Sequence, residues 1–154
     1  MSHNAENVMC RLVPDPDPLT VGTSLSYLTW GLIDDPRYSY ARGADWSIVN
    51  GADAVYVPFP GFWSLSCALS SQTGQPEGTV FRLLIRVNNL TRFATAARTR
   101  VNALYQGPSI DTSGSPIYIE PGEPIQVQGS FTGGAAAEIT SQVSFLGVRL
   151  VEAV

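Results

Sequence analysis

The feature that most constrains this chain is a two-residue periodicity of apolar side chains. Phe81, Leu83, Ile85 and Val87 occupy every second position of one segment. Successive side chains of a strand point to opposite faces of its sheet, so this spacing places all four on the same face. The segment is therefore predicted to be a β-strand with one face in a core, and residues 125–128 show the same alternation.

Turn-forming residues separate apolar segments along the chain. It has 14 Gly and 11 Pro among 154 residues, and 14% of its residues are charged. Pairs such as Pro60-Gly61, Pro121-Gly122 and Gly133-Gly134 are typical of tight turns. Strands are expected within residues 24–33, 46–50, 54–59, 62–69 and 80–87. We therefore predict an all-β, antiparallel sandwich in one domain.

Residues 90–106 depart from this pattern. Leu90, Phe93, Ala97, Val101 and Leu104 have helical spacing, and Ala and Arg favour a helix. A strand is preferred here because alternating segments lie on both sides, but a helix is kept as an alternative.

The N-terminal segment is expected to be distinct from the domain. Three prolines make residues 13–18 a stiff connector. The apolar residues Val8, Met9 and Leu12 precede it, either as an arm that docks on a partner or as a first strand. We expect an arm and connector over residues 1–18 and the sandwich domain over residues 19–154.

Charge and cysteine content exclude several classes of protein. The net charge is −4 and all nine basic residues are Arg, so a nucleic-acid partner is not expected. No apolar run is long enough to cross a membrane, and the start of the chain does not resemble a signal peptide. Cys10 and Cys67 are expected to be buried free thiols rather than a disulfide.

Two segments suggest contact with a second chain. In residues 62–69 the face of Ser64, Ser66 and Ala68 is small, which allows a neighbouring layer to approach closely. In residues 145–151 both faces are largely apolar, which for an antiparallel strand indicates cover on both sides. The predicted contact residues are Phe62, Val143, Phe145 and Arg149.

Three segments resemble the tumour necrosis factor-like jelly roll found in the globular heads of complement-type proteins. Residues 57–65 (VPFPGFWSL) resemble its Pro-x-x-Gly-x-aromatic entry to a central strand. Residues 119–127 (IEPGEPIQV) resemble its Gly-Asp/Glu turn, and residues 143–150 (VSFLGVRL) its terminal Phe-x-Gly strand. The resemblance implies a jelly-roll β-sandwich that forms a homotrimer, and it implies no ligand. The chain departs from the family in its long, Tyr- and Trp-rich residues 34–50.

Residues suited to catalysis or metal binding are sparse. His3 is the sole histidine and lies in a polar tail, which argues against a Ser-His-Asp site or a histidine metal cluster. The pairs Asp15/Asp17 and Asp34/Asp35 are typical of turns beside proline. We therefore expect a protein that is not an enzyme and binds no metal or cofactor.

Free-standing domains of this type recur in bacteriophage virions, which suggests the function. The expected function is a trimeric capsid decoration protein on the virion surface, made in the host cytoplasm. Val8, Met9 and Leu12 would dock it on the major capsid protein. The alternative is the receptor-binding head of a tail fibre or minor tail protein. That head would stack a bacterial surface glycan on Trp30, Tyr38, Tyr40 and Trp46. Partial burial of these rings against the sandwich is the preferred alternative for the four residues.

Overall fold

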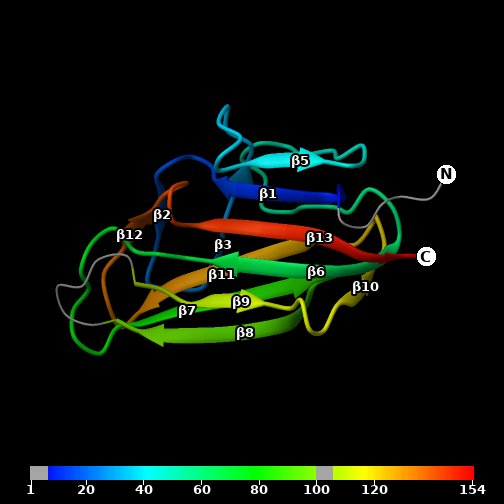
Figure 1. Cartoon of the computed structure of the whole chain (residues 1–154). Coiled ribbons are helices and arrows are strands. Elements are labelled where there is room, and N and C mark those ends of the chain that lie inside the picture. Colours follow the sequence, from blue (N-terminus) through cyan, green and yellow to red (C-terminus); the bar gives the residue numbers. More distant parts are fainter. Residues whose placement is uncertain (1–6, 100–105) are drawn as a thin grey trace.

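The computed structural model describes residues 7–99 and 106–154, which form an all-β sandwich of two main sheets (Figure 1). Every strand ladder is antiparallel, as predicted. No helix in the described residues is long and apolar enough to cross a membrane. The strands are β1 (Met9–Pro14), β2 (Leu19–Val21), β3 (Ser26–Tyr27), β4 (Trp30–Gly31), β5 (Tyr40–Arg42), β6 (Gly61–Ala68), β7 (Val80–Val87), β8 (Leu90–Arg98), β9 (Ser109–Asp111), β10 (Ile117–Ile119), β11 (Ile125–Thr132), β12 (Ala137–Ile139) and β13 (Phe145–Ala153).

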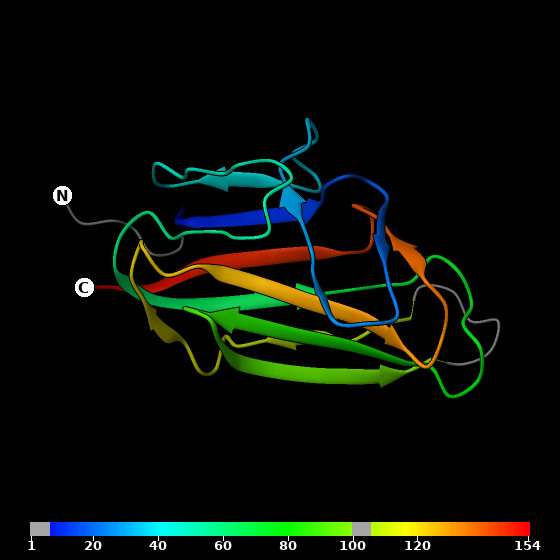
Figure 2. The ribbon, with the colours of Figure 1, turned by 180° about the vertical axis from the view of Figure 1, so that it is seen from behind.

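The larger sheet has seven strands and contains both ends of the described fold. Its main path runs β10-β6-β13-β1-β4, while β5 pairs with β1 and β9 pairs with β6. The smaller sheet has the order β3-β11-β7-β8, and β12 pairs with β2 in a third, two-stranded sheet. The two main sheets lie as separate layers in the view from behind (Figure 2). Strands distant in sequence are neighbours in both sheets, as in a jelly roll.

The core lies between the two layers and follows the predicted alternation. Phe81, Leu83, Ile85 and Val87 are buried on β7. From the facing sheet β6 contributes Trp63, Leu65 and Cys67, and the rings of Phe81 and Phe131 lie 4.1 Å apart. Burying aromatic and aliphatic side chains in this way supplies the main stabilising free energy of such a sandwich.

Residues 90–98 form strand β8, so the helical alternative is wrong for this part. β8 pairs with β7 along its length, with an irregularity between Ile85 and Arg86. The Ala and Arg content of this segment alone favours a helix. Pairing with β7 instead provides hydrogen-bond partners for its backbone N–H and C=O groups. Val101 and Leu104 of the helical pattern lie outside the described residues.

Two of the expected strands are largely loop. Residues 46–50 form no strand, and residues 54–59 contribute one isolated bridge, between Val55 and Ile125. Trp46 instead packs its ring against Trp63 at a centroid distance of 5.6 Å. Apolar side chains here anchor a loop to the core without a strand ladder.

The N-terminal segment is part of the sandwich, which corrects the expected arm. β1 pairs with both β13 and β5. Val8 and Leu12 are buried in the core with Cys10 between them, because every second residue of this segment faces inward. The first-strand alternative is therefore right, residue 18 is no domain boundary, and Val8 and Leu12 are not free to dock on a partner.

The two chain ends leave the larger sheet together. Met9, at the start of β1, pairs with Arg149 near the end of β13. Both strands therefore have their free ends on one side of the molecule (Figure 1).

Candidate assembly surface

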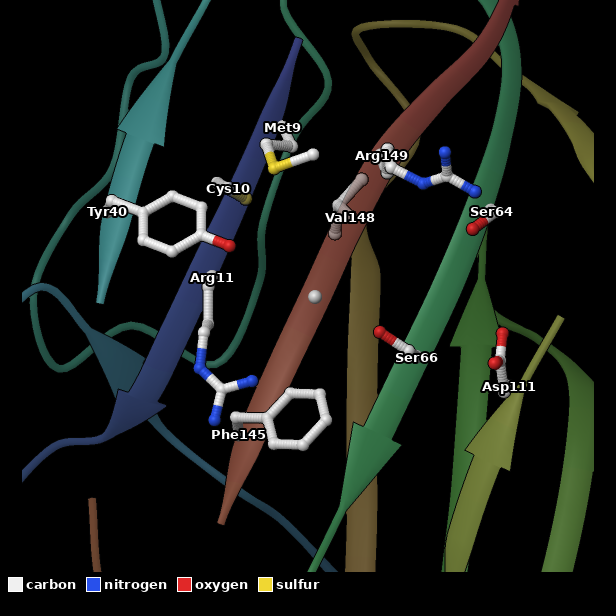
Figure 3. A pocket seen from close by; sticks show the side chains of 11 residues that line it. Met9, Cys10, Arg11, Tyr40, Ser64, Ser66, Asp111, Phe145, Val148 and Arg149 are labelled. Atoms are coloured by element: carbon white, nitrogen blue, oxygen red, sulfur yellow. The ribbon is translucent and has the colours of Figure 1, made fainter. Parts of the chain in front are cut away.

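The outer face of the larger sheet carries a shallow hollow of about 220 Å³ (Figure 3). It crosses β5, β1, β13, β6 and β9, so it forms only when strands from both ends of the sequence pair. The lining residues are Met9, Cys10, Arg11, Tyr40, Ser64, Ser66, Asp111, Phe145, Gly147, Val148 and Arg149.

Small residues make the floor of the hollow. The ladder places Gly147 opposite Arg11 on one side and Ser66 on the other, and Ser66 opposite Asp111. A Cβ atom added at Gly147 would lie 2.6 Å from the Ser66 hydroxyl oxygen. The floor is low because these residues are small, so the larger side chains around it stand above it.

Arg11 and Phe145 form one wall. The Arg11 guanidinium carbon lies 3.8 Å from the Phe145 ring centroid, and Arg11 Nε donates a hydrogen bond of 3.0 Å to the Tyr38 carbonyl. Burial lowers the pKa of the guanidinium from its ordinary value. No carboxylate pairs with Arg11 in the described part of the chain. A cation over an aromatic face is worth more when it is shielded from water.

A second pair of this kind lies beside the first. The Arg42 guanidinium carbon is 4.6 Å from the Tyr40 ring centroid, and Arg42 Nη2 donates to Met9 Sδ at 3.2 Å. Tyr40 faces Arg11 across the β1–β5 ladder. This end of the face therefore combines cations with aromatic and thioether surface.

Phe62 and Tyr118 extend the face at another point along β6. They are paired across the β6–β10 ladder, with ring centroids 5.7 Å apart in an edge arrangement. Phe62 is 38% exposed and Tyr118 is 42% exposed. The Tyr118 hydroxyl donates to Glu120 Oε1 at 3.0 Å, and this bond raises the pKa of Tyr118. Two large rings therefore remain open to solvent.

Three of the four predicted contact residues share this face. Phe145 and Arg149 alternate with the buried residues of β13, and Phe62 alternates with those of β6. Val143 lies in the turn before β13, where its amide donates to the Thr140 carbonyl. Of the predicted docking patch, Met9 alone lines the hollow.

The four aromatic residues predicted to stack a glycan do not form one exposed surface. Trp30 is buried in the core, and the Trp46 indole donates to the Arg42 carbonyl while its ring packs on Trp63. Tyr38 and Tyr40 are half-buried, and Tyr40 lines the hollow. The role given to Trp30 is wrong because this large ring fills space between the layers.

The candidate aspartates lie apart from the hollow. Asp35 pairs with Arg37 at 2.9 Å, which lowers the pKa of Asp35, and Asp17 accepts a hydrogen bond from the Ser141 amide. Cys10 and Cys67 are free and buried, as predicted. Among the described residues no three His, Cys, Asp or Glu side chains are grouped to hold a metal. His3 lies outside the described residues.

Arg11 and Tyr40 were not assigned to this face from sequence. Cys10 and Leu12 are apolar on either side of Arg11, so alternation would have placed Arg11 on the outer face of a strand. Because the proline-rich connector follows it, this segment was predicted to be a separate arm instead. Pairing of β5 with β1 has no such pattern, because β5 is three residues long.

Comparison with solved structures establishes the fold. The chain is similar to Eiger TNF from S. frugiperda, with 11% identity, a TM-score of 0.62 and coverage of 96% of this chain and 95% of that one. It has the fold of a tumour necrosis factor-like jelly roll. A structure of murine APRIL at pH 5.0 is similar with 13% identity, a TM-score of 0.65 and coverage of 94% and 99%. No protein-family model and no curated protein matches the sequence.

Proposed function

We propose that this chain is a non-enzymatic structural protein of a bacteriophage particle that assembles as a homotrimer and decorates the capsid. The observation that carries the assembly is the outer face of the larger sheet. There Phe145 and Tyr40 line a hollow with a floor of small residues, and Phe62 is exposed farther along β6. Large aromatic groups beside a low floor suit close packing against a second copy.

The cations of this face support the same conclusion. Arg11 and Arg42 each lie over an aromatic ring. Arginine and aromatic residues are enriched where protein surfaces bury one another. Asp111, on the opposite wall, offers a carboxylate to a neighbouring copy. The motif resemblance to the tumour necrosis factor-like family independently implies three copies.

The virion setting rests on sequence. Free-standing domains of this type recur on bacteriophage particles, and two buried free thiols suit a protein made in a reducing cytoplasm. Because β1 is part of the sandwich and cannot act as a docking arm, other surfaces would have to contact the major capsid protein. The receptor-binding head remains the second candidate, favoured by the charge of the smaller sheet described below.

A substitution on the outer face tests the assembly. Phe145→Asp would remove the aromatic ring and place a carboxylate beside Arg11 at the contact, where burying both charges should cost several kcal/mol per chain. Light scattering during gel filtration should give three times the 16.5 kDa chain mass for the parent protein and one chain mass for the variant.

Tyr27→Asp is the matched control. Tyr27 is 39% exposed on β3 of the other sheet, and this variant should remain trimeric. A trimeric Phe145→Asp variant, or a parent protein that is monomeric at micromolar concentration, would contradict the proposed assembly.

Copy number separates the two virion roles. Quantitative mass spectrometry of purified particles should find a decoration protein in amounts comparable with the major capsid protein. A fibre head would be present in a few copies per particle. Absence of the chain from purified particles would reject both.

A further inference from the structure

Charge is divided unequally between the two main sheets. Four of the nine arginines, Arg82, Arg86, Arg92 and Arg98, lie on β7 and β8 of the smaller sheet. None of the 13 acidic residues lies in the four described strands of that sheet. All charged side chains in the strands of this sheet are therefore positive, although the net charge of the chain is −4.

The register places three of these four cations on the outer face. Arg82 and Arg86 alternate with the core residues of β7, and Arg98 is paired with Val80, on the same face as Arg82. Gln126 lies opposite Arg86, so amide groups border the arginines. With a rise of about 3.3 Å per residue, Arg82 and Arg86 are roughly 13 Å apart along the strand.

The arginines have no anionic partner in the described part of the chain. The one salt bridge among those residues joins Arg37 to Asp35, far from these strands in sequence. Arg86 donates through Nη2 to the Asn89 carbonyl, while its Nε is buried without a hydrogen-bond partner. The carboxylate of Asp53 approaches at the Arg86 end, where it accepts from Gln126 at 3.5 Å.

Protection of a sheet edge explains only half of this arrangement. β8 is an edge strand, and charges on an edge prevent pairing with another sheet. That accounts for Arg92 and Arg98. β7 lies between β11 and β8, so edge protection does not account for the half-buried Arg82 and Arg86.

We propose that the outer face of the smaller sheet binds an acidic polysaccharide. Carboxylates of the polymer pair with Arg82, Arg86 and Arg98, and sugar hydroxyls bond to the amides of Gln126 and Gln128. A sheet face with cations spaced along a strand matches an extended polymer whose charges repeat. This surface belongs to the opposite layer from the hollow, so the inference goes beyond the proposed assembly and does not depend on it.

Nucleic acid fits this face less well. Single-stranded nucleic acids bind where several aromatic side chains stack on successive bases. Tyr27 is the one exposed aromatic side chain on the four described strands, because Phe81 and Phe131 are buried and Phe93 is half-buried opposite Ile85. A longer duplex would also meet the acidic residues that lie outside this sheet.

Binding to immobilised sodium polygalacturonate and hyaluronate, two polymers of uronic acids, tests the proposal by biolayer interferometry. The parent protein should bind at least one of them, with affinity that falls as salt rises, and should not bind neutral dextran. An Arg82→Gln, Arg86→Gln, Arg98→Gln triple variant should bind roughly a hundredfold more weakly, and Arg98→Gln alone about fivefold more weakly.

The matched control is Arg37→Gln, which removes one exposed charge from outside the smaller sheet and should leave affinity unchanged. A thermal melt verifies that each variant is folded, and Arg98→Gln serves if the triple variant is not. Failure to bind either polymer, equal binding by the triple variant, or tighter binding to single-stranded DNA than to both polymers would overturn the proposal. The monomeric Phe145→Asp variant should still bind, which separates this result from the outcome for assembly.

Discussion

Cys10 and Cys67 lie on the core faces of β1 and β6, where water does not reach their thiols. Burial raises the pKa of Cys10 from 9.0 to about 12, although a backbone hydrogen bond from Val148 opposes part of that effect. Burial also raises the pKa of Cys67. Both side chains therefore stay neutral in the folded protein under conditions in which an exposed cysteine begins to ionise.

This difference makes stability sensitive to alkaline pH. The unfolded chain loses its thiol protons from about pH 9, before the folded chain does, so the free energy of unfolding falls as pH rises above that value. Each thiol should contribute a slope of up to about 1.4 kcal/mol per pH unit until the pH reaches its folded pKa. Urea unfolding at pH 8, 9 and 10 measures the slope.

The Cys10→Ala, Cys67→Ala variant isolates the thiol contribution from that of Tyr and Arg. The variant is expected to be less stable at every pH because of the lost packing, but with a shallower pH dependence. Equal slopes for the two proteins would show that the thiols are not buried in the folded state.

β1 is the element whose role changes most between sequence and structure. It lies between β13 and the β5 and β4 strands, and it contributes Cys10 and Leu12 to the core. Deleting residues 1–13 should therefore abolish cooperative unfolding, because it exposes the edge of β13 and opens the core. Circular dichroism during a urea titration measures this.

Arg11→Ala is the control on the same strand. Arg11 points to the outer face, so its replacement should leave a folded protein that loses less than about 2 kcal/mol of stability. If the truncated chain unfolds as cooperatively as the parent, β1 is not part of the core.

The sequence predicted elements well where a pattern is long and repeated. The alternation of residues 81–87 placed β7 and its core face correctly, and the small face predicted for β6 contributes Ser64 and Ser66 to the hollow. Elements of two or three residues, such as β4 and β5, have too few positions for any periodicity to appear. Their pairing depends on partners distant in sequence, and this is why Trp30 was considered as a glycan contact and Tyr40 was not expected beside Arg11.

At the scale of the whole molecule, assembly and folding should be linked. If only folded chains form the proposed trimer, mass action stabilises the fold more at higher protein concentration. A tenfold increase in concentration should raise the melting temperature by on the order of 2–4 °C. Thermal scans by circular dichroism at three concentrations measure the effect.

The monomeric Phe145→Asp variant provides the reference. Its melting temperature should not change with concentration, whereas Tyr27→Asp should behave like the parent protein. A parent protein whose melting temperature is also constant would mean that unfolding is not coupled to dissociation.

The common side on which β1 begins and β13 ends has a practical consequence. A tag or fused domain at either terminus leaves the sandwich in the same direction, so the smaller sheet and the far loops stay accessible on an immobilised protein. The same proximity allows the old ends to be joined by a short linker and new ends to be opened in a distant turn. In such a circular permutant, the site at which the protein is tethered can be chosen separately from the face of the sandwich that is exposed.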